Sequence, residues 1–174
     1  MVLIALSTTE CTVSQHKGAD AVQQSLTEEA ARRYIFQYLQ RTANEIGVKF
    51  SLSPDGVNHA TAFEPADTMP CYDGHRERGP HQVQALYWVA GVPPGQTSRF
   101  FSLLRDTWKN WGWKLDPKAT NTLAALGTPD HYTFIVQDAG KGDGWLSIVA
   151  ASPCFPYEGL GAETPAPDVI EGTP

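Results

Sequence analysis

The sequence predicts an α+β fold in which two helices pack on one face of a mainly antiparallel sheet. Two amphipathic segments each end at a glycine, and short β-rich segments alternate with turns that contain Pro and Gly. The chain has 174 residues, 41% of them hydrophobic, which is enough for one domain with a sizeable core. We expect a signal remnant and tether at residues 1–24, the domain at 25–156 and a disordered tail at 157–174, where Gly, Pro, Asp and Glu dominate.

The first predicted helix runs from Gln23 to Gly47 and has signals at both ends. Ser25 or Thr27 can cap its first turn, acidic residues follow in that turn, and Gly47 ends it. Its opposite face is polar and solvated, so the apolar stripe is expected to pack against the sheet. That stripe consists of Ala31, Tyr34, Ile35, Tyr38, Leu39, Thr42 and Ile46.

Two short strands and a long loop are predicted after this helix. Residues Val48 to Leu52 alternate in polarity, residues 53–56 (Ser-Pro-Asp-Gly) form a turn, and a second strand is expected from Val57 to Phe63. Three prolines and two glycines then predict a loop from Glu64 to His81.

The clearest pattern in the chain is a strand, a tight turn and a helix. β-Branched and aromatic residues from Gln82 to Val92 predict a buried strand, which Pro93-Pro94-Gly95 ends. A helix follows, and Gly112 terminates it. Its expected buried face consists of Phe100, Leu103, Leu104, Trp108 and Trp111.

Two aromatic residues near this helix lie off the predicted buried face. They are Phe101 and Trp113, and they are therefore candidates for a binding surface. Trp88 and Trp145, each expected on a sheet face, are further candidates for the same surface.

The last third of the sequence predicts more antiparallel strands. One begins at residues 113–115, and another is expected from Thr120 to Leu126, where Leu-Ala-Ala-Leu is also compatible with a helix. Residues His131 to Val136 and Trp145 to Ala151 flank a Gly-rich segment and read as a hairpin. The segments 46–50 and 111–115 share the order apolar, Gly, apolar, Lys, apolar, which suggests two similar halves, each a helix followed by strands.

The charge balance argues against some classes of protein. The formal net charge is −6 and the pI is about 5.3, whereas a nucleic-acid binder needs a basic stripe to displace counterions from phosphates. We therefore expect no nucleic-acid partner. No segment approaches the roughly 18 to 20 apolar residues that span a bilayer.

The N-terminal segment indicates export. An apolar run from Val2 to Leu6 precedes small polar residues and Cys11, as at the end of a secretory signal. One interpretation is a frayed hydrophobic terminus. The other is that Cys11 is the acylated cysteine of a lipoprotein, although Glu10 departs from the small residue that such signals place before the cysteine.

Cysteine usage supports export independently. Cys71 and Cys154 lie in Pro-flanked segments that bound separate strand-rich blocks, so we expect a disulfide between them, the alternative being two reduced thiols. Closing such a loop would stabilise the fold by about 4 kcal/mol, and only in an oxidising compartment.

One polar cluster is a candidate for metal or catalytic chemistry. It lies in the loop that contains Cys71, Asp73, His75, Glu77 and His81, but its spacing is that of neither a zinc finger nor a His-Glu-x-x-His helix. A disulfide at Cys71 would also remove its thiolate. No Gly-x-Ser-x-Gly motif is present, so we predict no catalytic residues, no metal site and no cofactor.

The order of these features resembles a known group of proteins. The export-type N-terminus, the Pro-Cys segment at Cys71 and the Ser-Pro-Cys-Phe segment at Cys154 are similar to the layout of small envelope lipoproteins of mycobacteria and related actinobacteria, including versions carried by their phages. The resemblance covers about residues 25–156. It implies a protein on the outer face of the cytoplasmic membrane that acts in binding or interaction, and a phage version would serve to exclude competing phages.

We therefore expect a non-enzymatic, exported and lipid-anchored envelope protein whose partner is another envelope protein or a small amphiphilic ligand. The alternative is a secreted hydrolase or metal-binding protein that uses the loop from Cys71 to His81 with His59 or His131.

Overall fold

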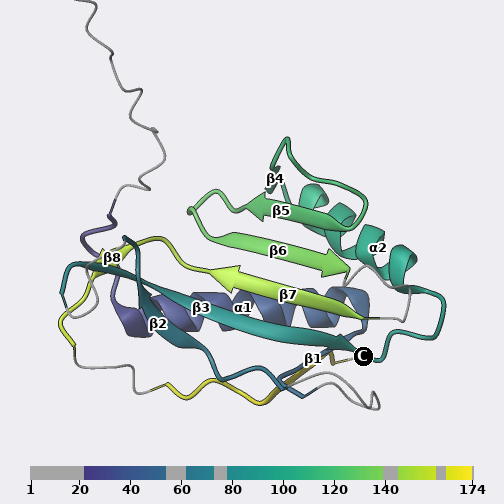
Figure 1. Ribbon diagram of the computed structural model, residues 1–174, viewed down its shortest axis with the longest axis horizontal. Coiled ribbons are helices and arrows are strands. Elements are labelled where there is room, and N and C mark those ends of the chain that lie inside the picture. Colours follow the sequence, from purple (N-terminus) through teal and green to yellow (C-terminus); the bar gives the residue numbers. More distant parts are fainter. Residues whose placement is uncertain (1–21, 54–61, 73–77, 139–144, 160–163, 174) are drawn as a thin grey trace, which may run out of the picture.

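The computed structural model describes residues 22–53, 62–72, 78–138, 145–159 and 164–173. Two helices and nine strands in these ranges form two layers, with the helices on one face of the sheet (Figure 1). The expected α+β fold is confirmed. In chain order the elements are α1 (Glu28–Ile46), β1 (Lys49–Ser51), β2 (Asp67–Pro70), β3 (Pro80–Ala90), α2 (Thr97–Asn110), β4 (Lys114–Leu115), β5 (Leu123–Gly127), β6 (Thr133–Asp138), β7 (Leu146–Ala151), β8 (Phe155–Pro156) and β9 (Val169–Glu171).

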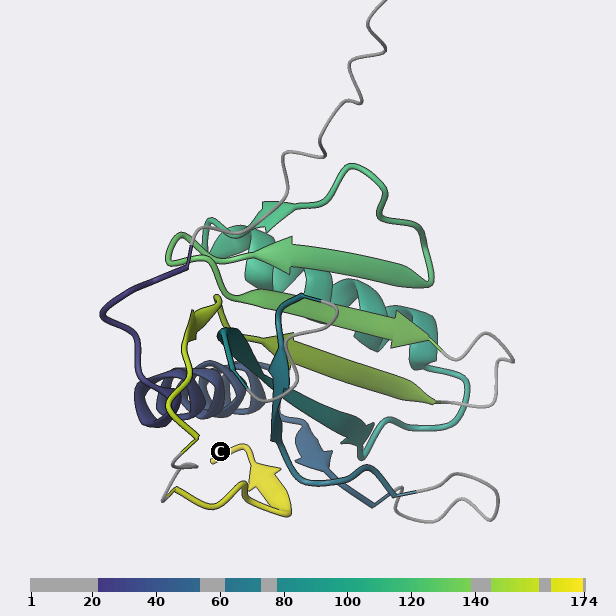
Figure 2. The same cartoon turned by 60° about the vertical axis from the view of Figure 1, so that its left-hand side comes forward.

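All the described strand pairs of the sheet are antiparallel. Its main path has the order β4-β5-β6-β7-β3-β1-β9, and β2 and β8 pair with the first half of β3. Strand β3 is therefore the centre of the sheet, with β7 on one side and β1 and β2 on the other. Figure 2 shows α2 behind β5, β6 and β7, with α1 at the left of the view.

Helix α1 begins and ends where its sequence signals lie. The side chain of Thr27 accepts a hydrogen bond from the N–H of Ala30 (3.2 Å), which satisfies one of the free donors of the first turn. Gly47 ends the helix in the left-handed conformation (φ 71°), and its N–H donates to the carbonyl of Ala43. The buried side of the helix includes Ile35, Leu39 and Thr42.

The two helices meet over the hydrophobic core. The buried indole of Trp108 on α2 donates from Nε1 to Oγ1 of Thr42 on α1 (3.0 Å). Alternate residues of β3, including Val83 and Tyr87, point into the same core and are fully buried. Both helices therefore cover the same face of the sheet, as the sequence predicts.

Several strand boundaries differ from those predicted. Residues 67–70 form β2 and residues 80–81 already belong to β3, so the predicted loop from Glu64 to His81 contains strand at both places. The strand expected from Val57 to Phe63 falls partly outside the described residues, and Phe63 itself lies in no strand. The strand expected from Thr120 to Leu126 occupies Leu123–Gly127.

The prediction of a disordered tail is wrong for residues 164–173. Strand β9 pairs with β1, so that Ser51 faces Val169 and Lys49 faces Glu171. Gln40 on α1 donates to the carbonyl of Glu171 (2.6 Å), and the side chain of Ile170 is buried. Composition misled here, because one buried isoleucine and backbone pairing suffice to dock a short polar segment.

The two helix-to-strand junctions are alike, but the strands after them are not. Gly47 and Gly112 both have positive φ (71° and 82°), and a strand beginning with Lys follows each. After α1 the chain forms β1, β2 and β3, whereas after α2 it forms a four-stranded meander from β4 to β7. The similarity of the halves is thus confined to the junctions.

In the part of the chain that the structure describes, neither helix combines the length and the apolar character needed to cross a bilayer.

Candidate functional site

The face of the sheet opposite the two helices carries no helix (Figure 1). Strands β3, β7, β6 and β5 present it in three rows of paired residues. We call these residues the helix-free face. The rows are Gln84, Ala151, Thr133 and Gly127; then Leu86, Val149, Ile135 and Ala125; then Trp88, Ser147, Gln137 and Leu123.

The helix-free face has no ionised side chain. The chain contains 13 Lys and Arg and 19 Asp and Glu, yet all twelve positions of the three rows hold apolar, amide, hydroxyl or small residues. Charges appear beyond the rows, at Lys114 beside Gly127, at Asp67 beside Gln84 and at Lys49 beside Ala90. The outward face of an antiparallel sheet is commonly polar, so this composition is unusual for a surface that only contacts water.

Apolar residues concentrate in the middle row. Leu86, Val149, Ile135 and Ala125 lie side by side across four strands, and each is partly exposed. At the outer end of the next row, Leu123 is 43% exposed. These side chains form a continuous apolar band that a partner surface can cover.

An aromatic cluster bounds the helix-free face at one corner. The ring of Phe63 stacks on Trp88 (centroids 4.6 Å apart), and Trp145 meets Trp88 edge to face (5.2 Å). Nε1 of Trp145 is buried and has no hydrogen-bond partner among the described residues. The structure therefore brings together two of the four predicted binding residues, Trp88 and Trp145, and adds Phe63.

The other two predicted binding residues, Phe101 and Trp113, are not on this surface. Phe101 is 1% exposed and Trp113 is 5% exposed, both within the core on the helix side. The prediction that they lie off the buried face is wrong. The buried side of α2 is centred on Thr97, Phe101, Leu104 and Trp108, while Leu103, predicted to be buried, is 40% exposed.

The turn after α2 explains the position of Trp113. Gly112 adopts positive φ (82°), and the N–H of Trp113 then donates to the carbonyl of Trp108 (3.1 Å). This turn folds the Trp113 ring back against Trp108 and Phe134, with centroids 5.5 and 4.8 Å away. Trp113 therefore belongs to the hydrophobic core beneath α2, although it lies outside the helix in sequence.

The predicted disulfide is present between Cys71 and Cys154, whose Cα atoms are 6.2 Å apart. It joins the end of β2 to the segment before β8, so Cys71 cannot serve as a thiolate ligand. Asp73, His75 and Glu77 lie outside the described residues, as do Cys11 and His59. Among the described residues, no group of three or more His, Cys, Asp or Glu side chains is arranged to hold a metal ion.

The two described histidines named as alternatives differ in their surroundings. His81 is buried, its Nδ1 lies 2.9 Å from the carbonyl of Gly79, and its ring packs against Tyr157. His131 is exposed in the turn before β6, where it has positive φ (71°). Both residues lie at the end of the sheet where β3 and β6 begin, but His81 is enclosed by Gly79 and Tyr157 whereas His131 is exposed.

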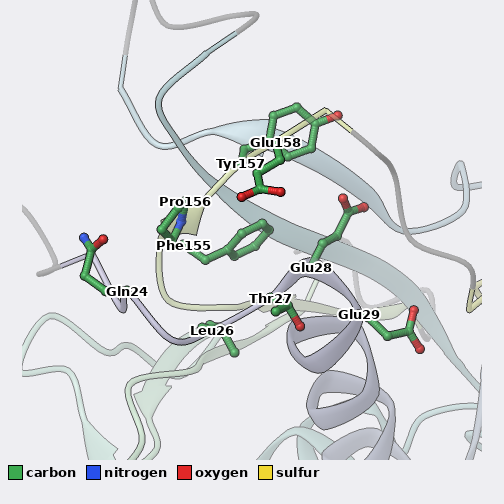
Figure 3. Close-up of a pocket in the computed structure, with 9 residues that line it drawn as sticks. All are labelled: Gln24, Leu26, Thr27, Glu28, Glu29, Phe155, Pro156, Tyr157 and Glu158. Carbon is green, nitrogen blue, oxygen red and sulfur yellow. The ribbon is translucent and has the colours of Figure 1, made fainter.

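A cleft of about 300 Å³ lies where α1 begins (Figure 3). Phe155 and Leu26 form its apolar part, and carboxylates surround its opening. Glu28 accepts hydrogen bonds from Arg32 (3.2 Å) and from Thr68, so this acid is already satisfied within the protein. The nine lining residues are Gln24, Leu26, Thr27, Glu28, Glu29, Phe155, Pro156, Tyr157 and Glu158.

A second acid of this cleft is also held internally. Glu29 accepts from the N–H of Thr164 (3.1 Å) and from the hydroxyl of the same residue. These contacts tie the start of α1 to the C-terminal segment. The cleft is therefore better explained as a junction between segments than as a site prepared for a cation.

The pKa values that depart most from their usual range belong to three tyrosines on the helix side of the sheet. Burial, together with a hydrogen bond to Asp130, raises the pKa of Tyr38 to about 12. Burial also raises the pKa of Tyr87 and of Tyr132 well above the usual value. All three phenols stay neutral at physiological pH, and none lies on the helix-free face.

Sequence reasoning missed Phe63, Leu86, Ile135 and Val149 as site residues. Alternation within each strand shows which residues share a face, but the pairing that aligns Leu86 with Val149 and Ile135 is not visible in it.

Compared with protein-family models, with characterised proteins and with solved structures, neither the sequence nor the fold has a significant match.

Proposed function

We propose that this chain is an exported, lipid-anchored envelope protein that acts as a non-enzymatic binding module, and that its partner is another envelope protein docked on the helix-free face. The observation that carries the proposal is the uncharged, partly apolar composition of that face. Interface cores in proteins are likewise depleted of charge and enriched in aromatic residues.

The disulfide supports the proposed location. Disulfides form and persist in oxidising compartments, such as the space outside the cytoplasmic membrane, and are rare in the cytosol. Cys71 and Cys154 are 83 residues apart in sequence, so their bond fixes two distant segments beside β3. Resemblance to actinobacterial envelope lipoproteins supports the same location and suggests Cys11 as the anchored residue.

The N-terminal segment reaches the sheet at one end of β3, and the aromatic cluster lies toward the other. The N–H of Gln23 donates to the carbonyl of Cys154 (2.8 Å), at the end of the sheet where β3 starts. Trp88 lies seven residues beyond His81 on β3, which is about 23 Å along an extended strand. The aromatic cluster therefore lies near the end of β3 that is remote from the point where the N-terminal segment reaches the sheet.

The binding role is tested by comparing three forms of the full chain as affinity baits for solubilised envelope proteins. We expect the native chain and Gln37→Glu, a control on the exposed side of α1, to retain the same protein, and Ile135→Glu to lose it. Circular dichroism and thermal melting of each form would show that the folds are equal. Retention that is indifferent to Ile135→Glu would contradict the proposal.

The anchor is tested on the protein purified from cells that make it naturally. Mass spectrometry of the peptide containing Cys11 is expected to show a diacylglyceryl group on its sulfur. An unmodified Cys11 in the membrane fraction would remove the anchor from the proposal without affecting the binding face.

A further inference from the structure

The geometry of the helix-free face points to the form of its partner: we propose that a single amphipathic α-helix of the partner protein lies on this face through an uncharged apolar stripe. This inference rests on the proposed function, and it adds the kind of element that docks. Four features of the sheet support it, namely its edges, its charge distribution, its area and the small residues in its outer rows.

The outer edges of the sheet leave little backbone for a partner strand. On one side, β4 and the loop after it cover β5: Lys114 and Leu115 pair with it, and the N–H groups of Asp116 and Thr120 donate to Ala125 and Leu123. The last strand there, β4, has only two residues. Addition of a strand would gain few hydrogen bonds at such an edge.

The opposite side of the sheet ends in two short strands. One is β9, with three residues, and the carbonyl of Glu171 already accepts from the side chain of Gln40. The other is β2, with four residues, of which Pro70 has no N–H to donate. A partner that recognises the described part of the sheet is therefore expected to use a face. One face is filled by α1 and α2, which leaves the helix-free face.

The side chains of this face select an uncharged and partly apolar partner surface. The middle row, from Leu86 to Ala125, offers no hydrogen bond, and none of the three rows offers an ionised group. A charge placed over them would lose water without gaining a counter-charge. A polyhydroxylated chain fits the amides of Gln84 and Gln137 but would leave its hydroxyl groups unpaired over the middle row.

The size of the face fits one element of secondary structure. Four strands about 4.8 Å apart and five residues long cover roughly 19 by 17 Å, or about 300 Å². A standard protein interface needs about 800 Å² from each partner, so the face is too small for a second copy of this chain to dimerise through it alone. A helix of about 12 residues is about 18 Å long and 10 Å wide, which the face accommodates.

Small residues allow such a helix to come close. Ala151, Thr133 and Gly127 form one row, and Ser147 separates Trp88 from Gln137 in another. The aromatic cluster of Phe63, Trp88 and Trp145 lies at one corner of the face, where it would limit the sideways position of the docked helix. Docking of an amphipathic helix by apolar residues spaced three and four apart is an established mode of recognition.

The test is site-specific photo-crosslinking of the full chain in the cells that produce it. A benzophenone amino acid is placed at Ile135, at Val149 or, as a control on α1, at Gln37. We expect Ile135 and Val149 to give the same adduct and Gln37 to give none. Sequencing of the crosslinked peptide should show apolar residues at positions i, i+3, i+4 and i+7, without charge among them.

A second variant keeps the test independent of crosslinking chemistry. Introducing Leu86→Glu into the Val149 crosslinking form should reduce the adduct at least tenfold, because it places a charge in the middle row next to position 149. Glu at Gln37 in the same form should leave the adduct unchanged. Persistence of the adduct with Leu86→Glu would overturn the proposal.

The remaining outcomes separate this inference from the proposed function. An adduct with a protein segment that lacks the helical repeat would overturn the helix and leave the binding module standing. An adduct with a glycan, a lipid or a second copy of this chain would overturn both the helix and the envelope-protein partner. Equal or absent adducts at all three positions would overturn both proposals.

Discussion

At the scale of single residues, the contact between Trp108 and Thr42 shows how the two helices are held together. The indole N–H is buried and donates to Oγ1 of Thr42, which itself donates to the carbonyl of Tyr38 (2.8 Å). Both side chains are fully buried, so no water replaces a lost partner. The hydrogen bond therefore fixes α1 against α2 within the core as well as satisfying a donor.

Replacing Thr42 by Val removes the acceptor of this hydrogen bond. Because Val has nearly the same shape as Thr, the packing is kept and the buried indole N–H is left unpaired. We expect Thr42→Val to lower the free energy of unfolding by about 1–3 kcal/mol, the usual cost of leaving a buried donor unpaired. In a double-mutant cycle with Trp108→Phe, measured by urea denaturation, a coupling of at least about 0.5 kcal/mol is expected. Additive effects of the two substitutions would show that this hydrogen bond does not stabilise the fold.

At the scale of elements, β9 depends on a close approach that only glycine permits. A Cβ added to Gly172 would lie 2.4 Å from the carbonyl oxygen of Ala43 and 2.9 Å from its carbon. Both atoms belong to the backbone of α1, so no side-chain rotation can relieve the clash. The C-terminal segment therefore follows α1 as closely as it does because residue 172 has no side chain.

Gly172→Ala should lift β9 from its place. We expect faster hydrogen exchange at residues 169–171 and at β1, with little change in β6 and β7, as measured by mass spectrometry of peptic peptides. Gly127→Ala is the matched control, because the nearest atom to its added Cβ is 4.0 Å away and its φ is not positive. Unchanged hydrogen exchange at β1 in the Gly172→Ala variant would contradict this prediction, because it would show that β9 stays paired with β1 despite the added Cβ.

At the scale of the whole molecule, the disulfide connects parts of the chain that the sheet alone holds weakly. Cys71 follows β2 and Cys154 precedes β8, and both strands pair with the first residues of β3. Strand β8 contributes only two residues. The disulfide therefore secures the end of the sheet where the N-terminal segment also arrives.

Loss of this disulfide should lower stability without changing the fold of the meander. We expect Cys71→Ala with Cys154→Ala to reduce the free energy of unfolding by about 2–5 kcal/mol, the range for loops of this kind. Cys11→Ala should leave it unchanged. Guanidinium denaturation of the three forms, with and without reductant, makes the comparison, and equal midpoints for the oxidised and double-alanine forms would refute it.

Much of the fold could be predicted because its signals are local. Thr27 and Gly47 delimit α1, Gly112 ends α2, and alternation in Val83 to Val89 indicates a strand with one buried face. The disulfide could be predicted because only two of the three cysteines lie in the Pro-flanked segments that bound strand-rich blocks. Each of these inferences uses residues within a few positions of one another, or a simple count.

The remaining features depend on contacts between distant residues. Along α2, Phe100 and Phe101 are equally apolar, and only packing against β5 and β6 decides that Phe101 is the more deeply buried. The row that contains Leu86, Val149 and Ile135 requires the register of three strands. The alternation of side chains along a strand assigns each one to a face of the sheet, but it does not identify the neighbouring residue on the next strand.

The docking of the C-terminal segment also has a consequence for the order in which the protein is built. Asn44 receives hydrogen bonds from Thr173, 129 residues later in the chain, so the outer edge of β1 has no partner strand until almost all of the described sequence has been made. Contacts of such long sequence separation form late and slow folding. An unfinished chain thus carries an open strand edge, which is a site for mispairing, and its closure by β9 is one of the last steps of folding.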